Sequence, residues 1–154
     1  ELAVVDLQGV AVDAREFGRP GPSYTVDTLE GLRHECGAER PLVWIIGADI
    51  LATLPRWSRW RALLDFAHVV VIGRPDAEPH PSEVSDWLSE HKVDKASLLS
   101  RPGGGVFTLA QPLLDISSSD IRAMIAEGLD PRFLLPDGVM EYISNHALFS
   151  RDLV

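Results

Sequence analysis

PLVWIIG, at residues 41–47, is the unbroken apolar run that decides the fold. It has the length of a strand, and its lack of polar alternation predicts burial on both faces, as in a parallel sheet covered by helices. HVVVIG at 68–73 repeats the pattern, and VFTLA at 106–110 is a third β-like run. GVAVDARE at 9–16 alternates apolar and polar residues and predicts a further strand.

Helical patterns separate these runs. Ser23 or Thr25 can cap a helix that ends near Cys36, and Gly37 stands where a glycine commonly ends a helix. Further helical stretches are expected at 48–54, 57–67, 83–92 (exposed), 117–127 and 136–149. Strands that alternate with helices predict an α/β domain with a mainly parallel sheet flanked by helices.

Composition excludes several classes of protein. The 154 residues suffice for one domain, and the net charge of −9 argues against a nucleic-acid partner. No apolar run is long enough for a membrane span, and the five histidines show no zinc-site spacing, so neither a membrane nor a metal site is expected. The single cysteine, Cys36, and the lack of a signal-peptide pattern predict a cytoplasmic protein.

Ligands of such sheets bind beyond the carboxyl ends of the strands. The loop after the first apolar run carries Asp49, which is placed to accept hydrogen bonds from ribose hydroxyls. Trp57 and Trp60 follow, and each can be either a core residue or a stacking wall for a flat heterocycle. Arg74 follows the second run, where it is either a surface residue or a cation facing the ligand.

DISSSDIR at 115–122 follows the third run and opens a predicted helix. Ser117, Ser118 and Ser119 can be an elaborate N-cap. They can also be a phosphate site, because the first turn of a helix exposes unpaired N–H groups and Arg122 lies one turn further on. The place of this segment after a buried strand, beside two other ligand-facing loops, favours the phosphate site.

The motifs of several other enzymes are absent. No nucleophile elbow or Walker lysine occurs, and RPGGGVF precedes a strand rather than a helix, so it is not a dinucleotide fingerprint. A catalyst of this sequence would therefore act by positioning its substrates and stabilising charge.

Four segments in this order resemble bacterial nicotinate-nucleotide adenylyltransferases: GPSYTVDTLEGLR, IIGADILATLPRWSRW, VVVIGRP and LDISSSDIR. The closing LLPDGVMEYISNHALF is similar to the end of that family, so the resemblance runs from about residue 9 to the end. It implies a Rossmann-like nucleotidyltransferase fold. It also implies transfer of AMP from ATP to nicotinate mononucleotide in NAD biosynthesis, with Mg²⁺ accompanying ATP.

The resemblance also implies roles for single residues. Tyr24 and Thr25 would lie at the nicotinate pocket, Asp49 would hold ribose hydroxyls, Trp57 would stack on the nicotinate ring and Arg74 would line the substrate site. Ser117, Ser118, Ser119 and Arg122 would bind the ATP phosphates, with Ser119 standing where the family usually has threonine.

One family motif, G-G-x-F-D-P-x-H-x-G-H, does not occur, and the first residue is Glu1 rather than methionine. We therefore expect residues 1–154 to form a single nucleotidyltransferase domain that lacks the family's N-terminal strand and H-x-G-H loop and holds no catalytic residue of that loop. Another adenylyltransferase, of the phosphopantetheine type, and a nucleotide-binding module without chemistry remain alternatives. The sequence leaves the oligomeric state open, with a homo-oligomer as one expectation.

Overall fold

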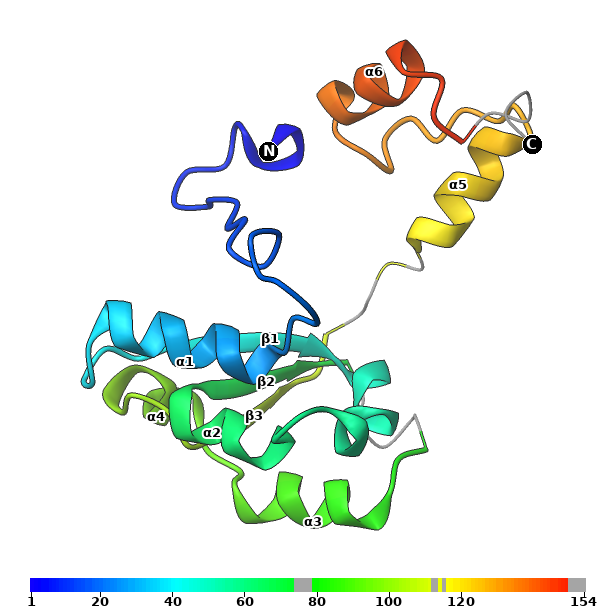
Figure 1. The fold of residues 1–154 in the computed structure, drawn as a ribbon. Coiled ribbons are helices and arrows are strands. Elements are labelled where there is room, and N and C mark those ends of the chain that lie inside the picture. The colour runs from blue at the N-terminus through cyan, green and yellow to red at the C-terminus, as the bar shows by residue number, and fades with distance from the viewer. Residues whose placement is uncertain (74–78, 112–113, 115, 150–154) are drawn as a thin grey trace. The chain divides into compact units, whose positions relative to one another are not determined.

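The computed structural model describes residues 1–73, 79–111, 114 and 116–149. They fall into two compact units, Arg15–Leu113 and a second unit of Glu1–Ala14 with Leu114–Val154. The described part of the first unit contains a three-stranded parallel sheet in the order β1-β2-β3 (Figure 1). The strands are β1 Val43–Gly47, β2 His68–Ile72 and β3 Val106–Leu109.

Helices and short 3-10 turns connect the strands. The first unit holds α1 Thr25–Cys36, η2 Ala48–Ala52, η3 Leu54–Arg56, η4 Trp60–Ala62, α2 Leu63–Phe66, α3 Ser82–Glu90 and α4 Lys95–Ser100. The second unit holds η1 Leu2–Val4, α5 Ser118–Ala126 and α6 Asp137–Asn145. The predicted α/β class, the parallel sheet and the three apolar runs as strands are confirmed.

One face of the sheet carries the core of the first unit. The register pairs Trp44 with Val69 and Ile46 with Val71, so these side chains share a face. The helices α1, α2 and α3 lie on the same side of the sheet (Figure 1). Their contributions to the core are Val26 and Leu29 from α1, Leu63 and Leu64 from α2, and Val84 and Trp87 from α3.

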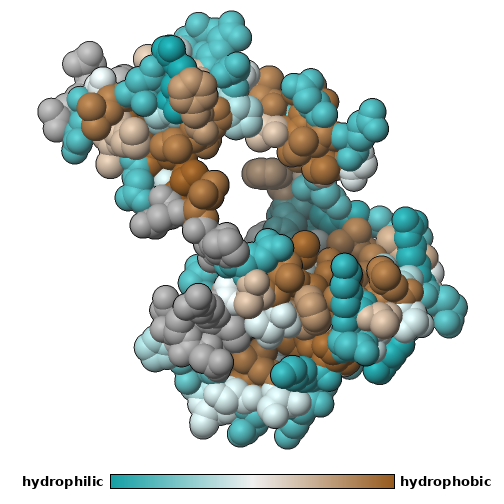
Figure 2. Space-filling view, turned by 180° about the vertical axis from the view of Figure 1, so that it is seen from behind, coloured by the Kyte–Doolittle hydropathy of each residue, from teal (hydrophilic) through white to brown (hydrophobic). Residues whose placement is uncertain are grey.

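The opposite face departs from the prediction for residues 41–47. Val43 and Ile45 are 43% and 59% exposed, so the expectation that this run is buried on both faces is wrong for β1. β1 is a terminal strand of the described sheet, and the core helices of its unit pack on one face only. Figure 2 shows hydrophobic side chains on the surface of this unit in the view from behind.

Three local predictions are corrected. Residues 9–16, all of which the structure describes, form turns and irregular chain instead of a strand, since Val10 and Val12 are exposed and pair with no described strand. α1 has Tyr24 as its N-cap residue without a side-chain cap, because the Ser23 hydroxyl donates to the Glu16 carbonyl oxygen. The helix expected at 83–92 exists as α3 but is not fully exposed, because it buries Val84 and Trp87.

Candidate nucleotide site

The carboxyl end of β1 positions Asp49. The strand ends at Gly47, and the buried side chains of Ala48 and Leu51 anchor the η2 turn that follows. Asp49 is exposed on this turn, and its carboxylate oxygen lies against Gly47, in the space that a side chain at Gly47 would take. The carboxylate therefore stands directly beyond a parallel strand, where such sheets bind ligands.

Trp57 and Trp60 have different surroundings. Trp60 is buried, and its ring packs edge-on against Trp87 with the ring centroids 5.5 Å apart, so Trp60 is a core residue. Trp57 follows η3 and is only partly buried; its ring lies 5.8 Å from that of Trp44. Part of the Trp57 ring thus remains available to a flat ligand.

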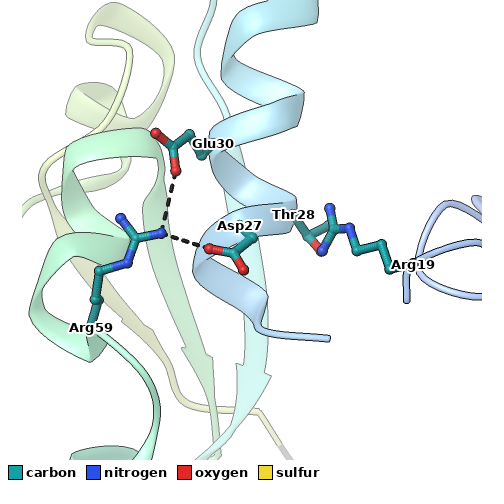
Figure 3. Close-up of polar contacts among 5 residues, drawn as sticks. All are labelled: Arg19, Asp27, Thr28, Glu30 and Arg59. Atoms are coloured by element: carbon teal, nitrogen blue, oxygen red, sulfur yellow. Dashed lines mark hydrogen bonds and ion pairs between the residues drawn. The ribbon is translucent and has the colours of Figure 1, made fainter. Parts of the chain in front are cut away.

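The first turn of α1 carries Tyr24 and Thr25. Tyr24 is 44% exposed, and the helix has no side-chain N-cap, so the backbone N–H groups of Thr25 and Val26 have neither a capping side chain nor an intrahelical acceptor. Such a turn favours a negatively charged group. The turn lies at the end of the sheet to which the strands point, as does the loop after β1 (Figures 1 and 3).

Arg59 joins the loop of Trp57 to this turn, and the sequence prediction missed it. Its Nη2 donates to Oδ1 of Asp27 at 2.6 Å and to Oε2 of Glu30 at 3.3 Å (Figure 3). The hydrogen bond with Asp27, and after it that with Glu30, raises the pKa of Arg59 above its ordinary value. The sequence held two signals: an arginine between Trp57 and Trp60, and a pair of acidic residues, Asp27 and Glu30, within one helical turn. No local rule pairs groups that lie about thirty residues apart in the sequence.

The serines lie at the start of α5, in the second unit. Ser117 is the N-cap: its Oγ accepts from the backbone N–H of Asp120 at 3.0 Å and donates to Oδ2 of Asp120 at 2.5 Å. Nη2 of Arg122 donates to Oγ of Ser119 at 3.3 Å. No hydrogen bond joins the Ser118 hydroxyl to another described residue. One serine therefore caps the helix, while Ser118, Ser119 and the exposed Arg122 side chain can face an anion.

The structure brings the predicted residues together in two groups. Tyr24, Thr25, Asp49 and Trp57 belong to the first unit. The second unit holds Ser117, Ser118, Ser119 and Arg122. Arg74 lies outside the described residues.

The described residues contain neither a cluster of metal-binding side chains nor a membrane-spanning helix. No group of three or more His, Cys, Asp or Glu side chains in the described part of the chain is arranged to hold a metal ion. None of the described helices has the length and apolar character needed to cross a membrane.

The chain was compared with known protein families and structures. The family model described as cytidylyltransferase-like matches residues 12–124, which places the chain among nucleotidyltransferases of the Rossmann-like fold. Two solved structures of Plasmodium falciparum nicotinic acid mononucleotide adenylyltransferase share this fold, one complexed with APC and one with NaAD, each with a TM-score of 0.56. Their sequences are 15% and 16% identical to this chain. The matched regions cover 84% and 83% of this chain and 59% and 58% of the two solved chains.

Sequence relatives narrow the family. A protein of Pseudomonas aeruginosa (strain UCBPP-PA14) named "Probable nicotinate-nucleotide adenylyltransferase" is 43% identical over 150 residues, 97% of this chain and 70% of its own length. A protein of the same name from Yersinia pestis (strain Pestoides F) is 45% identical over 152 residues, 97% of this chain and 69% of its own length. The chain belongs to the nicotinate-nucleotide adenylyltransferase family.

Proposed function

We propose that the protein transfers AMP from ATP to nicotinate mononucleotide and so makes nicotinate adenine dinucleotide and pyrophosphate in NAD biosynthesis. An oxygen of the mononucleotide phosphate attacks the α-phosphorus of ATP, and the bond from that phosphorus to the departing pyrophosphate breaks. One observation carries the proposal. Relatives named "Probable nicotinate-nucleotide adenylyltransferase" match 97% of the chain, including the loop that places Asp49 and Trp57 beyond β1.

The mononucleotide would occupy the first unit. Asp49 would accept hydrogen bonds from ribose hydroxyls, and the partly buried Trp57 would stack on the nicotinate ring. The uncapped first turn of α1, with Tyr24 and Thr25, offers backbone N–H groups to the pyridine carboxylate. Arg74 is proposed to line the same site.

The ATP phosphates would bind at the start of α5. Ser118 and Ser119 present hydroxyls and backbone N–H groups there, and Arg122 adds a charged donor. Ser117 would contribute while also capping the helix. Acceleration would come from alignment of two anions and from neutralisation of their charge.

Nucleotidyltransferases of this type generally use a divalent cation. We propose that it is Mg²⁺ and that it arrives with ATP, because Mg²⁺ is commonly held by phosphate oxygens and water with few protein ligands. It would neutralise charge on the phosphates.

Three statements stay predictions: that residues 1–154 form a single nucleotidyltransferase domain without the family's strand and H-x-G-H loop, that the protein is cytoplasmic, and that it can be a homo-oligomer. The sequence of the complete reading frame that contains these residues tests the first directly. Cell fractionation and light scattering test the others.

The activity is tested by pyrophosphate release, with protein expressed from the complete reading frame that contains these residues. We expect release that requires both ATP and nicotinate mononucleotide. Trp57→Ala should raise KM for the mononucleotide far more than KM for ATP, because only the mononucleotide loses a stacking partner. Equal changes in the two constants would contradict the stacking role, and binding of both nucleotides without turnover would indicate a module without chemistry.

A further inference from the structure

Arg59 adopts a backbone conformation that needs an explanation. Its φ of 49° and ψ of 36° lie in the left-handed region, which residues other than glycine rarely adopt. Such a conformation persists where its surroundings hold it in place. Arg59 stands between Trp57, at the candidate site, and Trp60, which is buried in the core.

The surroundings of Arg59 come from two segments. On one side, the burial of Trp60 fixes the chain that follows Arg59. On the other side, the carboxylates of Asp27 and Glu30 hold the guanidinium group, at 2.6 and 3.3 Å (Figure 3). Both carboxylates belong to the first two turns of α1, the helix that begins at Thr25.

The contact is poorly suited to a role in stability alone. The side chains of Arg59, Asp27 and Glu30 are 51%, 44% and 41% exposed, and exposed ion pairs contribute little to folding. Its geometry suits a role in positioning. The contact links the loop that carries Trp57 to the first turns of α1, where N–H groups are offered to an anion.

We propose that Arg59 is a positioning residue for the mononucleotide. Through Asp27 and Glu30 it would fix the spacing between the ring of Trp57 and the first turn of α1. A pyridine carboxylate ligand needs this spacing, since its ring stacks on one element while its carboxylate meets the other. The inference rests on the proposed function, and it adds a residue that touches neither substrate.

Arg61 provides a matched control two residues further along. It is also an exposed arginine in an ion pair, with Nη2 at 2.7 Å from Oε2 of Glu83, and its side chain is 61% exposed. Its partner belongs to α3, so the pair does not link the Trp57 loop to α1. A general effect of lost surface charge would appear equally in Arg59→Ala and Arg61→Ala.

The test measures binding of nicotinate mononucleotide, and of ATP separately, by calorimetry with protein from the complete reading frame. We expect Arg59→Ala to weaken mononucleotide binding roughly tenfold, in line with the sensitivity of bound substrates to small misplacements. ATP binding should change less than about twofold, and the melting temperature should stay near that of Arg61→Ala. Arg59→Lys should recover most of the binding because it keeps a cation near both carboxylates.

A double-mutant cycle shows whether the effect passes through α1. Asp27→Asn should weaken mononucleotide binding in the wild-type background and add little in the Arg59→Ala background, because the link is already broken. If the wild-type protein binds the mononucleotide and Arg59→Ala binds it as well as Arg61→Ala does, the positioning role is wrong while the proposed function stands. If the wild-type protein does not bind the mononucleotide, both are wrong.

Discussion

At the scale of single residues, Asp49 depends on the absence of a side chain at Gly47. The backbone of Gly47, with φ −75° and ψ 155°, suits any residue, so glycine is not required for conformation. It is required for space, because Oδ1 of Asp49 lies closer to the place of a Cβ on Gly47 than real contacts allow. Gly47 therefore sets the position of the Asp49 carboxylate at the end of β1.

Gly47→Ala tests whether Gly47 sets the position of the Asp49 carboxylate. Among the described residues, the new methyl group comes close only to the far end of the Asp49 side chain. This side chain can turn aside, so the free energy of unfolding should change by less than about 1 kcal/mol. Mononucleotide binding should weaken as much as in Asp49→Ala, since the carboxylate is displaced in one case and absent in the other. Urea unfolding and calorimetry measure the two quantities.

Gly138→Ala is the control for a new methyl group, because no atom of the described residues lies within 4 Å of the added carbon and the site is remote in sequence, in α6. If Gly47→Ala binds the mononucleotide with wild-type affinity, Asp49 does not need the position that Gly47 allows, and this interpretation of Gly47 is wrong.

Residue-level prediction succeeded where position in the chain is enough. Asp49 could be placed because it follows a strand, and Ser117 because a serine before an apolar helix is a common cap. Arg59 could not be placed, because its partners are brought to it by the packing of α1 beside the loop after β1. The difference in burial between Trp57 and Trp60 likewise depends on residues far away in the sequence, because Trp57 packs against Trp44 and Trp60 against Trp87.

At the scale of elements, Arg33 holds three segments together. It lies in the last turn of α1 and uses all five of its N–H donors on backbone carbonyl oxygens. Nε and Nη2 donate to Phe66 at 3.0 and 2.7 Å, and Nη2 also donates to Pro102 at 2.6 Å. Nη1 donates to Gly37 at 2.9 Å and to Arg40 at 2.6 Å. The end of α1, the end of α2 and the loop before β3 thus share one side chain.

Arg33→Lys should lower the free energy of unfolding by about 2–4 kcal/mol, because an ammonium group keeps the charge but cannot reach these carbonyls in a planar array. Urea unfolding measures the loss. Arg40→Lys is the control, since the Arg40 side chain is exposed and only its carbonyl oxygen is used, and it should stay within about 0.5 kcal/mol of wild type. Equal stability of the two variants would contradict the structural role of Arg33.

Element-level prediction was right about the type of the three apolar runs and less so about their environment. The apolar runs became strands because β-branched residues favour the pleated chain and because helices connect them. The exposure of Val43 and Ile45 could not be foreseen, since burial depends on which elements cover each face. The run at 9–16 alternates as a strand does, but alternation alone supplies no partner.

At the scale of the whole molecule, the family follows from the order of several motifs along the chain, and the relatives match 97% of it. The cysteine count and the acidic net charge narrowed the class of protein but could not name a substrate. We propose that substrate choice depends on the few residues beyond β1 and at the starts of α1 and α5, and this proposal most needs a direct measurement.

That measurement is a competition. Protein from the complete reading frame is given ATP, Mg²⁺ and equal concentrations of nicotinate mononucleotide and phosphopantetheine, and the adenylylated products are quantified by mass spectrometry. We expect nicotinate adenine dinucleotide as the dominant product, formed in a one-to-one ratio with pyrophosphate, because the proposed site, with Trp57 and the first turn of α1, would suit a flat, carboxylate-bearing ring. Dominant adenylylation of phosphopantetheine, or no adenylylated product at all, would contradict it.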